Sequence, residues 1–256
     1  MNSLRKMLAL TLCLVFIVGC LASCDILDSL GGQNKSPDSY EATVRIVFAS
    51  NDEKIVSALD TNSDSKIMVD GENMQILTRT KTHSISAENT YTLADGVLYH
   101  KLSVSNGVLS ADQLTRADMG ENESYLLLIA VGPGADIGID DFANVNKNGT
   151  SDNCSYSCKS INEDAKVGIQ SILSEKLAII GGTVTLVDAT YSLETEDGLD
   201  KSATLSCNLL VTLDGQSYEV TMRTYTDYDY DVDFSDITSP ENAAEYTKVS
   251  FEEILK

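Results

Sequence analysis

Three Asp-Gly pairs, each lying between two strand-like stretches, constrain the fold of this chain more than any other feature. They are Asp70-Gly71, Asp95-Gly96 and Asp214-Gly215. Such a pair favours the two-residue turn of a β-hairpin, because both of its residues tolerate the positive φ angles that this turn requires. The sequence therefore predicts antiparallel sheet built from successive hairpins.

The turn of the last hairpin also predicts its register. With Asp214-Gly215 at the tip, the apolar face carries the pairs Val211–Tyr218, Leu209–Val220, Cys207–Met222 and Leu205–Thr224. The opposite face carries the polar pairs Thr212–Ser217, Asn208–Thr221 and Ser206–Arg223. One face should join the core and the other should meet water. By the same reasoning, Asp95-Gly96 places His100 opposite Tyr91.

Strict alternation of apolar and polar residues begins at Ser39. One face carries Tyr40, Ala42, Val44, Ile46 and Phe48, which is typical of a half-buried strand. Asn51-Asp52-Glu53 is expected to turn the chain. Residues 54–59 would then pair with the first strand.

Two segments are expected to form the main helices. The unbroken apolar run Tyr125–Val131 suggests a buried helix or a lid. A second helix, capped by Ser160 or Asn162, carries apolar residues at helical spacing until Gly181-Gly182 ends it: Ala165, Ile169, Ile172, Leu173, Leu177 and Ile180. A strand over residues 184–193 should lie beside it.

The last residues of the chain are expected to form two short helical segments. Ser239-Pro240-Glu241 is typical of a helix start, because proline is favoured in the first turn. Ser250 and Glu253 have the spacing of a capping box for a terminal turn.

The N-terminus reads as an export signal. Arg5 and Lys6 precede an apolar run over residues 7–18, which is shorter than the roughly 20 residues of a membrane span. Leu21-Ala22-Ser23-Cys24 then resembles the cleavage motif of bacterial lipoproteins. That resemblance implies a diacylglyceryl group on Cys24, whose two acyl chains would anchor the protein firmly. Ile17-Val18-Gly19-Cys20 fits the same pattern, so Cys20 is the alternative lipidation site.

These features predict three regions: a signal peptide over residues 1–23, a flexible tether over 24–38, and a single domain over 39–256. The protein would sit on the outer face of a cell membrane, in an envelope of the Gram-positive type. The sequence does not predict its oligomeric state.

The charge balance disfavours anionic partners. The chain has a net charge of −21, and cleavage before Cys24 would remove two basic residues, which gives 16 − 39 = −23. A surface this acidic repels phosphate backbones and anionic headgroups. We therefore expect no nucleic-acid binding, and no membrane binding driven by charge.

After the signal, three cysteines remain: Cys154, Cys158 and Cys207. An odd number permits at most one internal disulfide. If Cys154 and Cys158 lie in one extended strand, their Cα atoms are about 13 Å apart, which is too far for a disulfide. Without a second cysteine pair or nearby histidines, a zinc site is not expected.

Two groups of oxygen-bearing side chains were weighed as metal sites. Asp60, Asn62 and Asp64 match the start of an EF-hand loop, but Ser65 stands where that loop needs glycine and Gly71 where it needs glutamate. Near the C-terminus the acids alternate along the chain: Asp227, Asp229, Asp231 and Asp233. They fit either a divalent-cation site or the solvated face of a strand whose tyrosines point inward, and we favour the strand.

No catalytic or cofactor motif is present in the sequence. His83 and His100 are the only histidines, and we find no nucleophile elbow, phosphate loop or metal-binding helix. We therefore expect no enzymatic activity and no cofactor.

The order of the elements resembles the LolA/LppX-type lipoprotein carriers. The resemblance is carried by the hairpin Thr90–Tyr99 with its paired tyrosines and by the ending Val232-x-Phe234-Ser-x-Ile237-x-x-Pro240-Glu241. It implies an α+β fold in which a strongly curved antiparallel half-barrel wraps around a few helices and encloses an apolar cavity. The cavity-lining candidates are Tyr125, Leu127, Leu128, Ile169, Ile172 and Leu173.

Two functions follow from these features. The first is an anchored lipoprotein that binds or carries a lipophilic ligand in the cavity between sheet and helices. The alternative is an envelope scaffold or protein-interaction lipoprotein with a filled core. The presence or absence of a cavity that holds an acyl chain separates them.

Overall fold

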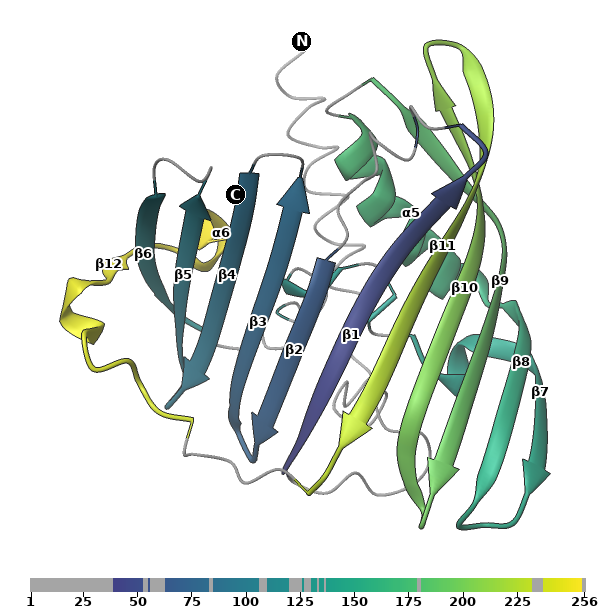
Figure 1. The fold of residues 1–256 in the computed structure, drawn as a ribbon, viewed down its shortest axis with the longest axis horizontal. Coiled ribbons are helices and arrows are strands. Elements are labelled where there is room, and N and C mark those ends of the chain that lie inside the picture. The colour runs from purple at the N-terminus through teal and green to yellow at the C-terminus, as the bar shows by residue number, and fades with distance from the viewer. Residues whose placement is uncertain are drawn as a thin grey trace, which may run out of the picture.

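The computed structural model describes residues 39–52, 55, 63–82, 85–105, 110–119, 126, 130–132, 134–135, 137–178, 181–231 and 237–254. Their strands form one twelve-stranded sheet, in the order β12-β6-β5-β4-β3-β2-β1-β11-β10-β9-β8-β7 (Figure 1). Neighbouring strands are antiparallel except for β12 and β6, which are parallel.

The first half of the sheet contains β1 (Ser39–Ser50), β2 (Ser63–Asp70), β3 (Asn73–Thr82), β4 (Ile85–Ala94), β5 (Val97–Ser105) and β6 (Ser110–Asp118). The second half contains β7 (Phe142–Gly149), β8 (Cys154–Ile161), β9 (Thr183–Glu196), β10 (Leu199–Leu213) and β11 (Gln216–Asp229). The short elements are the 3-10 turns η1 (Ile139–Asp141) and η2 (Ala243–Glu245), strand β12 (Thr247–Lys248) and helix α6 (Phe251–Ile254). Helix α5 spans Glu163–Ala178.

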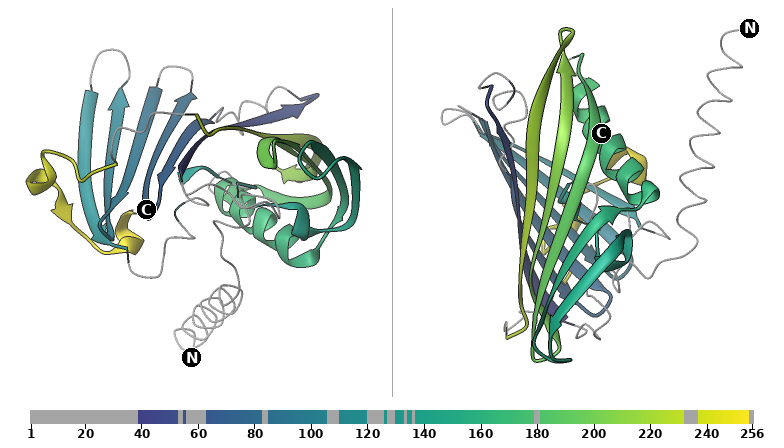
Figure 2. Two further views of the ribbon diagram at one scale, coloured as in Figure 1. Left: turned by 90° about the horizontal axis from the view of Figure 1, so that it is seen from below. Right: turned by 90° about the vertical axis from the view of Figure 1, so that its right-hand side faces the viewer.

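Strand β1 joins the two halves, because it pairs with β2 on one side and with β11 on the other. Figure 2 shows β2 to β6 on one side of this seam, while the strands from β7 to β11 fold over α5. The first described strand therefore lies in the middle of the sheet.

The core lies on one face of this sheet, which we call the inner face. Alternate residues of β1 (Tyr40, Ala42, Val44 and Ile46) are buried there, and so are alternate residues of β10 from Ala203 to Val211. Helix α5 covers β9 through Ile169, Leu173 and Leu177, each at most 2% exposed. The Asn162 side chain caps this helix by accepting a hydrogen bond from the Ala165 N–H at 2.8 Å.

The three predicted hairpins are present, but the turn between β2 and β3 is Gly71-Glu72 instead of Asp70-Gly71, because Asp70 still pairs with Asn73. Every residue pair expected around Asp214-Gly215 is present, and His100 lies opposite Tyr91 in the β4–β5 hairpin. Asp95 and Asp214 have positive φ, as do the glycines that follow them. Helix α5 and strand β9 also lie where the sequence places them.

The expected α+β fold, a half-barrel wrapped around a few helices, is wrong. The described residues form a mostly-β structure, in which α5 is the one α-helix longer than four residues. Alternation predicts the individual strands, but it does not reveal how many strands share one sheet. The order of the elements along the chain does not set the extent of the sheet either.

Two local predictions are also wrong. The strand that pairs with β1 begins at Ser63, and within the expected strand 54–59 the one described residue, Ile55, is helical. Asp64 and Ser65 of the rejected calcium loop belong to β2, while Asp60 and Asn62 lie outside the described residues. The turn expected from Pro240 begins at Ala243.

The C-terminal segment covers one edge of the sheet. Strand β12 pairs with Thr115 and Arg116 of β6, and the Lys248 ammonium lies 2.7 Å from the Asp118 carboxylate. Helix α6 follows, and the Glu253 carboxylate accepts a hydrogen bond from the Ser250 N–H at 3.0 Å. This bond is half of the predicted capping box.

Candidate functional site

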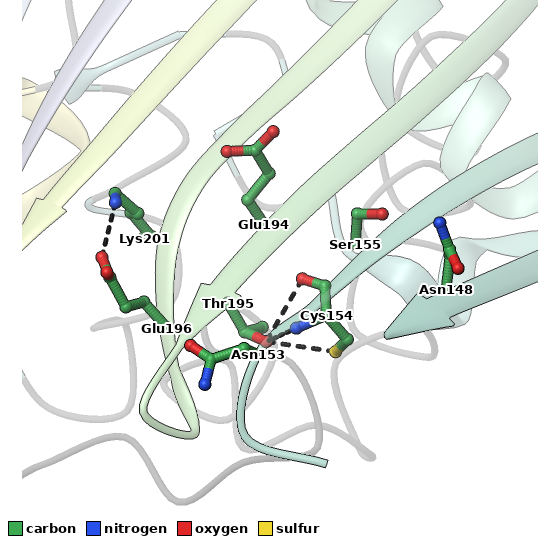
Figure 3. Close-up of a pocket in the computed structure, with 8 residues that line it drawn as sticks. All are labelled: Asn148, Asn153, Cys154, Ser155, Glu194, Thr195, Glu196 and Lys201. Carbon is green, nitrogen blue, oxygen red and sulfur yellow. Dashed lines mark hydrogen bonds and ion pairs between the residues drawn. The ribbon is translucent and has the colours of Figure 1, made fainter. Parts of the chain in front are cut away.

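A polar pocket of about 320 Å³ lies at the end of the sheet where β7, β8, β9 and β10 meet. Figure 3 shows the side chains that line it: Asn148, Asn153, Cys154, Ser155, Glu194, Thr195, Glu196 and Lys201. These residues come from two hairpins that α5 separates in the sequence. The pocket therefore depends on the pairing of β8 with β9.

Backbone contacts hold the two hairpin ends together. The Gly198 N–H donates to the Asp152 carbonyl at 2.8 Å, and the Asp197 N–H donates to the Asn153 side-chain oxygen at 3.3 Å. Gly149 has φ +115, and a Cβ at this position would come within 2.4 Å of the Asn153 carbonyl oxygen. A larger residue there would open the β7–β8 turn.

Cys154 and Thr195 are paired across β8 and β9, and both are buried. The Thr195 hydroxyl accepts a hydrogen bond from the Cys154 N–H at 3.2 Å and lies 3.1 Å from the Cys154 Sγ. Figure 3 shows both contacts converging on this hydroxyl. The Cys154 thiol is therefore held in one place on the inner face, while Ser155 and Glu194, its neighbours along β8 and β9, point to the opposite, exposed face.

The electrostatic surroundings of Cys154 favour its thiolate. Burial alone would raise the pKa of the thiol, but hydrogen bonds from Thr195 and Tyr156 and the positive charge of Lys147 outweigh it. The pKa therefore lies below the ordinary cysteine value. Lys147 is held over the Tyr156 ring, with its Nζ 5.1 Å from the ring centroid.

The other two cysteines have the opposite environment. Burial raises the pKa of Cys158, and it raises the pKa of Cys207 to about 12. All three thiols are free, and Cys154 and Cys158 both lie in the extended β8, where their spacing excludes a disulfide between them. Within this set, Cys154 has the chemistry of a reactive thiol.

The rest of the pocket is lined by positively charged, negatively charged and neutral polar side chains. Lys201 forms an ion pair with Glu196, while Glu194, Ser155 and Asn148 line the same space (Figure 3). No group of three or more His, Cys, Asp or Glu side chains in the described part of the chain is placed to hold a metal ion.

A second polar cluster lies on the inner face of β4, β5 and β6. The His100 ring nitrogens lie 3.0 Å from the Asn89 side-chain oxygen and 3.4 Å from the Thr115 hydroxyl. Burial lowers the pKa of His100 to about 4, so the ring is neutral at physiological pH. The hairpin register predicts that His100 lies opposite Tyr91 but leaves open whether it is packed or exposed, and in the structure it is packed.

The predicted functional residues are only partly described. Cys20, Cys24, Tyr125, Leu127 and Leu128 lie outside the described residues. Ile169 and Leu173 are each 1% exposed and belong to the hydrophobic core, and Ile172 is half-buried.

Among the described residues, the alternating aspartates near the C-terminus do not come together as a metal site. Asp227, Asp229 and Asp231 are exposed, and Asp233 lies outside the described residues. Tyr228 and Tyr230 pack against Tyr40, with ring centroids 6.1 and 6.2 Å from it. Strand β11 ends at Asp229, so in this row Asp227 and Asp229 lie in a strand with their carboxylates toward solvent and Tyr228 toward the core. That the row binds no cation stays a prediction.

Sequence reasoning missed the Cys154 pocket. The alternation of Cys154, Tyr156 and Cys158 was a usable signal that both thiols share the inner face with that tyrosine. The partner Thr195 had no such signal, because a helix separates β8 from β9 and no short turn sets their register.

Comparisons with known proteins do not assign this chain to a family. No family model matches it, and no curated protein matches it. Among solved structures, an isomerase-inactive variant of GphF DH1 gives a TM-score of 0.17 at 6% identity, over 79% of each chain. An inactive mutant of the CurJ dehydratase with a bound compound gives 0.13 at 8% identity, over 74% of this chain and 75% of that one. Scores this low carry no argument about fold or function.

Proposed function

We propose that this chain is a non-enzymatic interaction protein of the cell envelope, anchored by a lipid on Cys24 (or Cys20) at the outer face of the membrane. Its sheet would present a hydrated surface to another envelope component. The anchor is supported by the export signal and by Leu21-Ala22-Ser23-Cys24. No helix in the described residues is both long and apolar enough to span a bilayer.

The observation that carries this proposal is the burial of the α5 side chains expected to line a lipid cavity. Ile169 and Leu173 are each 1% exposed. Accessible area is the area that a water-sized sphere can touch, so a cavity wide enough for an acyl chain would leave these side chains measurably exposed. Their burial supports a filled interior beneath α5.

The opposite face of the sheet is suited to a hydrated partner. It carries ion pairs between strands, with Lys66 and Glu41 2.8 Å apart and Arg79 and Glu88 2.9 Å apart. Such exposed pairs contribute little to stability but keep a sheet face solvated. The net charge of −21 would repel polyanionic partners.

The competing function is the lipid carrier. It requires an apolar cavity. Of its remaining candidate residues, Ile172 is half-buried, and Tyr125, Leu127 and Leu128 lie outside the described residues. The two functions make opposite predictions about acyl-chain binding, so one titration separates them.

The test is a titration of the purified chain with a fluorescent fatty acid, beside a lipid-carrier protein of similar size as the positive control. We expect no saturable increase in fluorescence for this chain. A saturable signal with one site per chain, displaced by unlabelled fatty acid, would instead establish the carrier.

A further inference from the structure

We propose that the free edge of β7 is a docking edge for β7 of a second copy of this chain, so that two sheets join across a two-fold axis. The inference rests on the geometry and charge of the β7–β8 hairpin. It does not depend on the proposed function.

Strand β7 is the last strand of the sheet, and it pairs on one side only among the described residues (Figure 1). Its register with β8 is regular from Asn144 to Gly149, and every residue after Phe142 is exposed. An edge strand of this kind presents unpaired backbone N–H and C=O groups that another strand can bind.

The opposite side of the sheet differs, because its long strand β6 is covered by another segment. There the C-terminal segment covers β6: β12 pairs with Thr115 and Arg116, and the Val249 N–H donates to the Arg116 carbonyl at 2.9 Å. No described segment covers β7 in this way. Of the two edges, β7 is therefore the one left open for a partner strand.

Charge permits a second copy as that partner. The hairpin over residues 142–161 carries Lys147, Lys159 and Asp152, a net charge of 2 − 1 = +1, in a chain with a net charge of −21. Two copies of so acidic a protein repel each other over most of their surfaces. They can approach through this hairpin without bringing acidic surfaces together.

The side-chain pattern of β7 is also self-complementary. Asn144, Asn146 and Asn148 share one face, and Val145 and Lys147 share the other. A two-fold axis perpendicular to the sheet keeps each face on its own side, so amides would face amides across the new antiparallel pair. Val145, which is 41% exposed, would gain an apolar neighbour.

The test uses the full chain, solubilised in mild detergent and examined by native mass spectrometry over a wide concentration range. Val145→Lys places one more positive charge on each β7 strand near the two-fold axis, so the two strands should repel each other. Val187→Lys is the matched control, because Val187 is a 63% exposed valine on the interior strand β9. Circular dichroism establishes that both variants are folded.

We expect the parent chain to form a dimer whose fraction rises with concentration. Val145→Lys should lower the association constant about tenfold or more, while Val187→Lys leaves it unchanged. Hydrogen exchange should show β7 amides becoming protected as the dimer forms. A monomer at every concentration, an open-ended series of larger assemblies, or an equal dimer fraction in folded Val145→Lys would each overturn the proposal.

Discussion

His100 stacks on Tyr91 across the β4–β5 hairpin, with ring centroids 4.4 Å apart and an interplanar angle of 8°. Both residues are 7% exposed, and the imidazole nitrogens are placed against Asn89 and Thr115. The stack fixes a neutral imidazole inside the sheet.

This burial makes the stability of the protein depend on pH. The pKa of His100 is about 4 in the folded chain and about 6.5 in the unfolded chain, so between these values the unfolded state binds more protons. The stabilisation is fully present above pH 6.5 and is lost as pH falls toward 4, by roughly 3 kcal/mol at most.

Urea unfolding followed by circular dichroism across this pH range is the appropriate measurement. The many carboxylates titrate in the same window, so the informative quantity is the difference between the parent and His100→Phe. We expect the variant to show a shallower loss of stability toward acid. Identical slopes for parent and His100→Phe would contradict the assigned pKa.

The environment of Cys154 predicts selective alkylation. Because the pKa of Cys154 is lowered and the pKa values of Cys158 and Cys207 are raised, iodoacetamide near neutral pH should modify Cys154 first. Peptide mapping by mass spectrometry gives the order of modification, and in denaturant the three rates should converge. Thr195→Val should slow the native reaction at Cys154. Faster native alkylation of Cys207 would refute this assignment.

Substitutions in α5 test how tightly the interior is packed. Leu173→Ala should lower the free energy of unfolding by about 2–5 kcal/mol, because the fully buried side chain leaves a void behind. Val187→Ala, at an exposed position, should change it by less than about 0.5 kcal/mol. If the loss at Leu173 is as small as at Val187, the side chain borders open space and the filled interior is wrong.

Two glycines should respond to alanine in opposite directions. A Cβ on Gly134, which has φ +85, would come within 2.4 Å of the buried Leu205 Cδ2, whereas one on Gly168 in α5 meets nothing within 4 Å. Gly134→Ala should therefore destabilise the protein by about 1–3 kcal/mol. Gly168→Ala should stabilise it by roughly 0.5–1 kcal/mol. Thermal melts of both variants check the signs, and a gain at Gly134 would be inconsistent with this packing.

The elements fixed by local signals were predictable from the sequence. Asp214-Gly215 sets the whole β10–β11 register, because a two-residue turn leaves no freedom in pairing. Asn162 and Gly181-Gly182 bound the α5 region for similar local reasons.

The long-range pairings were not predictable in the same way. Strand β1 pairs with β11, so Ala42 faces Tyr228 although the two residues are far apart in the sequence. Nothing in the alternation of β1 selects that partner, so the twelve-stranded sheet was mistaken for a half-barrel around several helices. The Cys154 pocket was missed for the same reason, since it depends on the β8–β9 pairing.

We propose that the interior of this protein holds no lipid. The most direct measurement is native mass spectrometry of the chain isolated from membranes, followed by organic extraction and lipid analysis of the same sample. The account predicts the mass of the chain with its covalent anchor alone, unchanged after incubation with lipid mixtures. A reproducible noncovalent lipid at constant stoichiometry would contradict it and establish the carrier function.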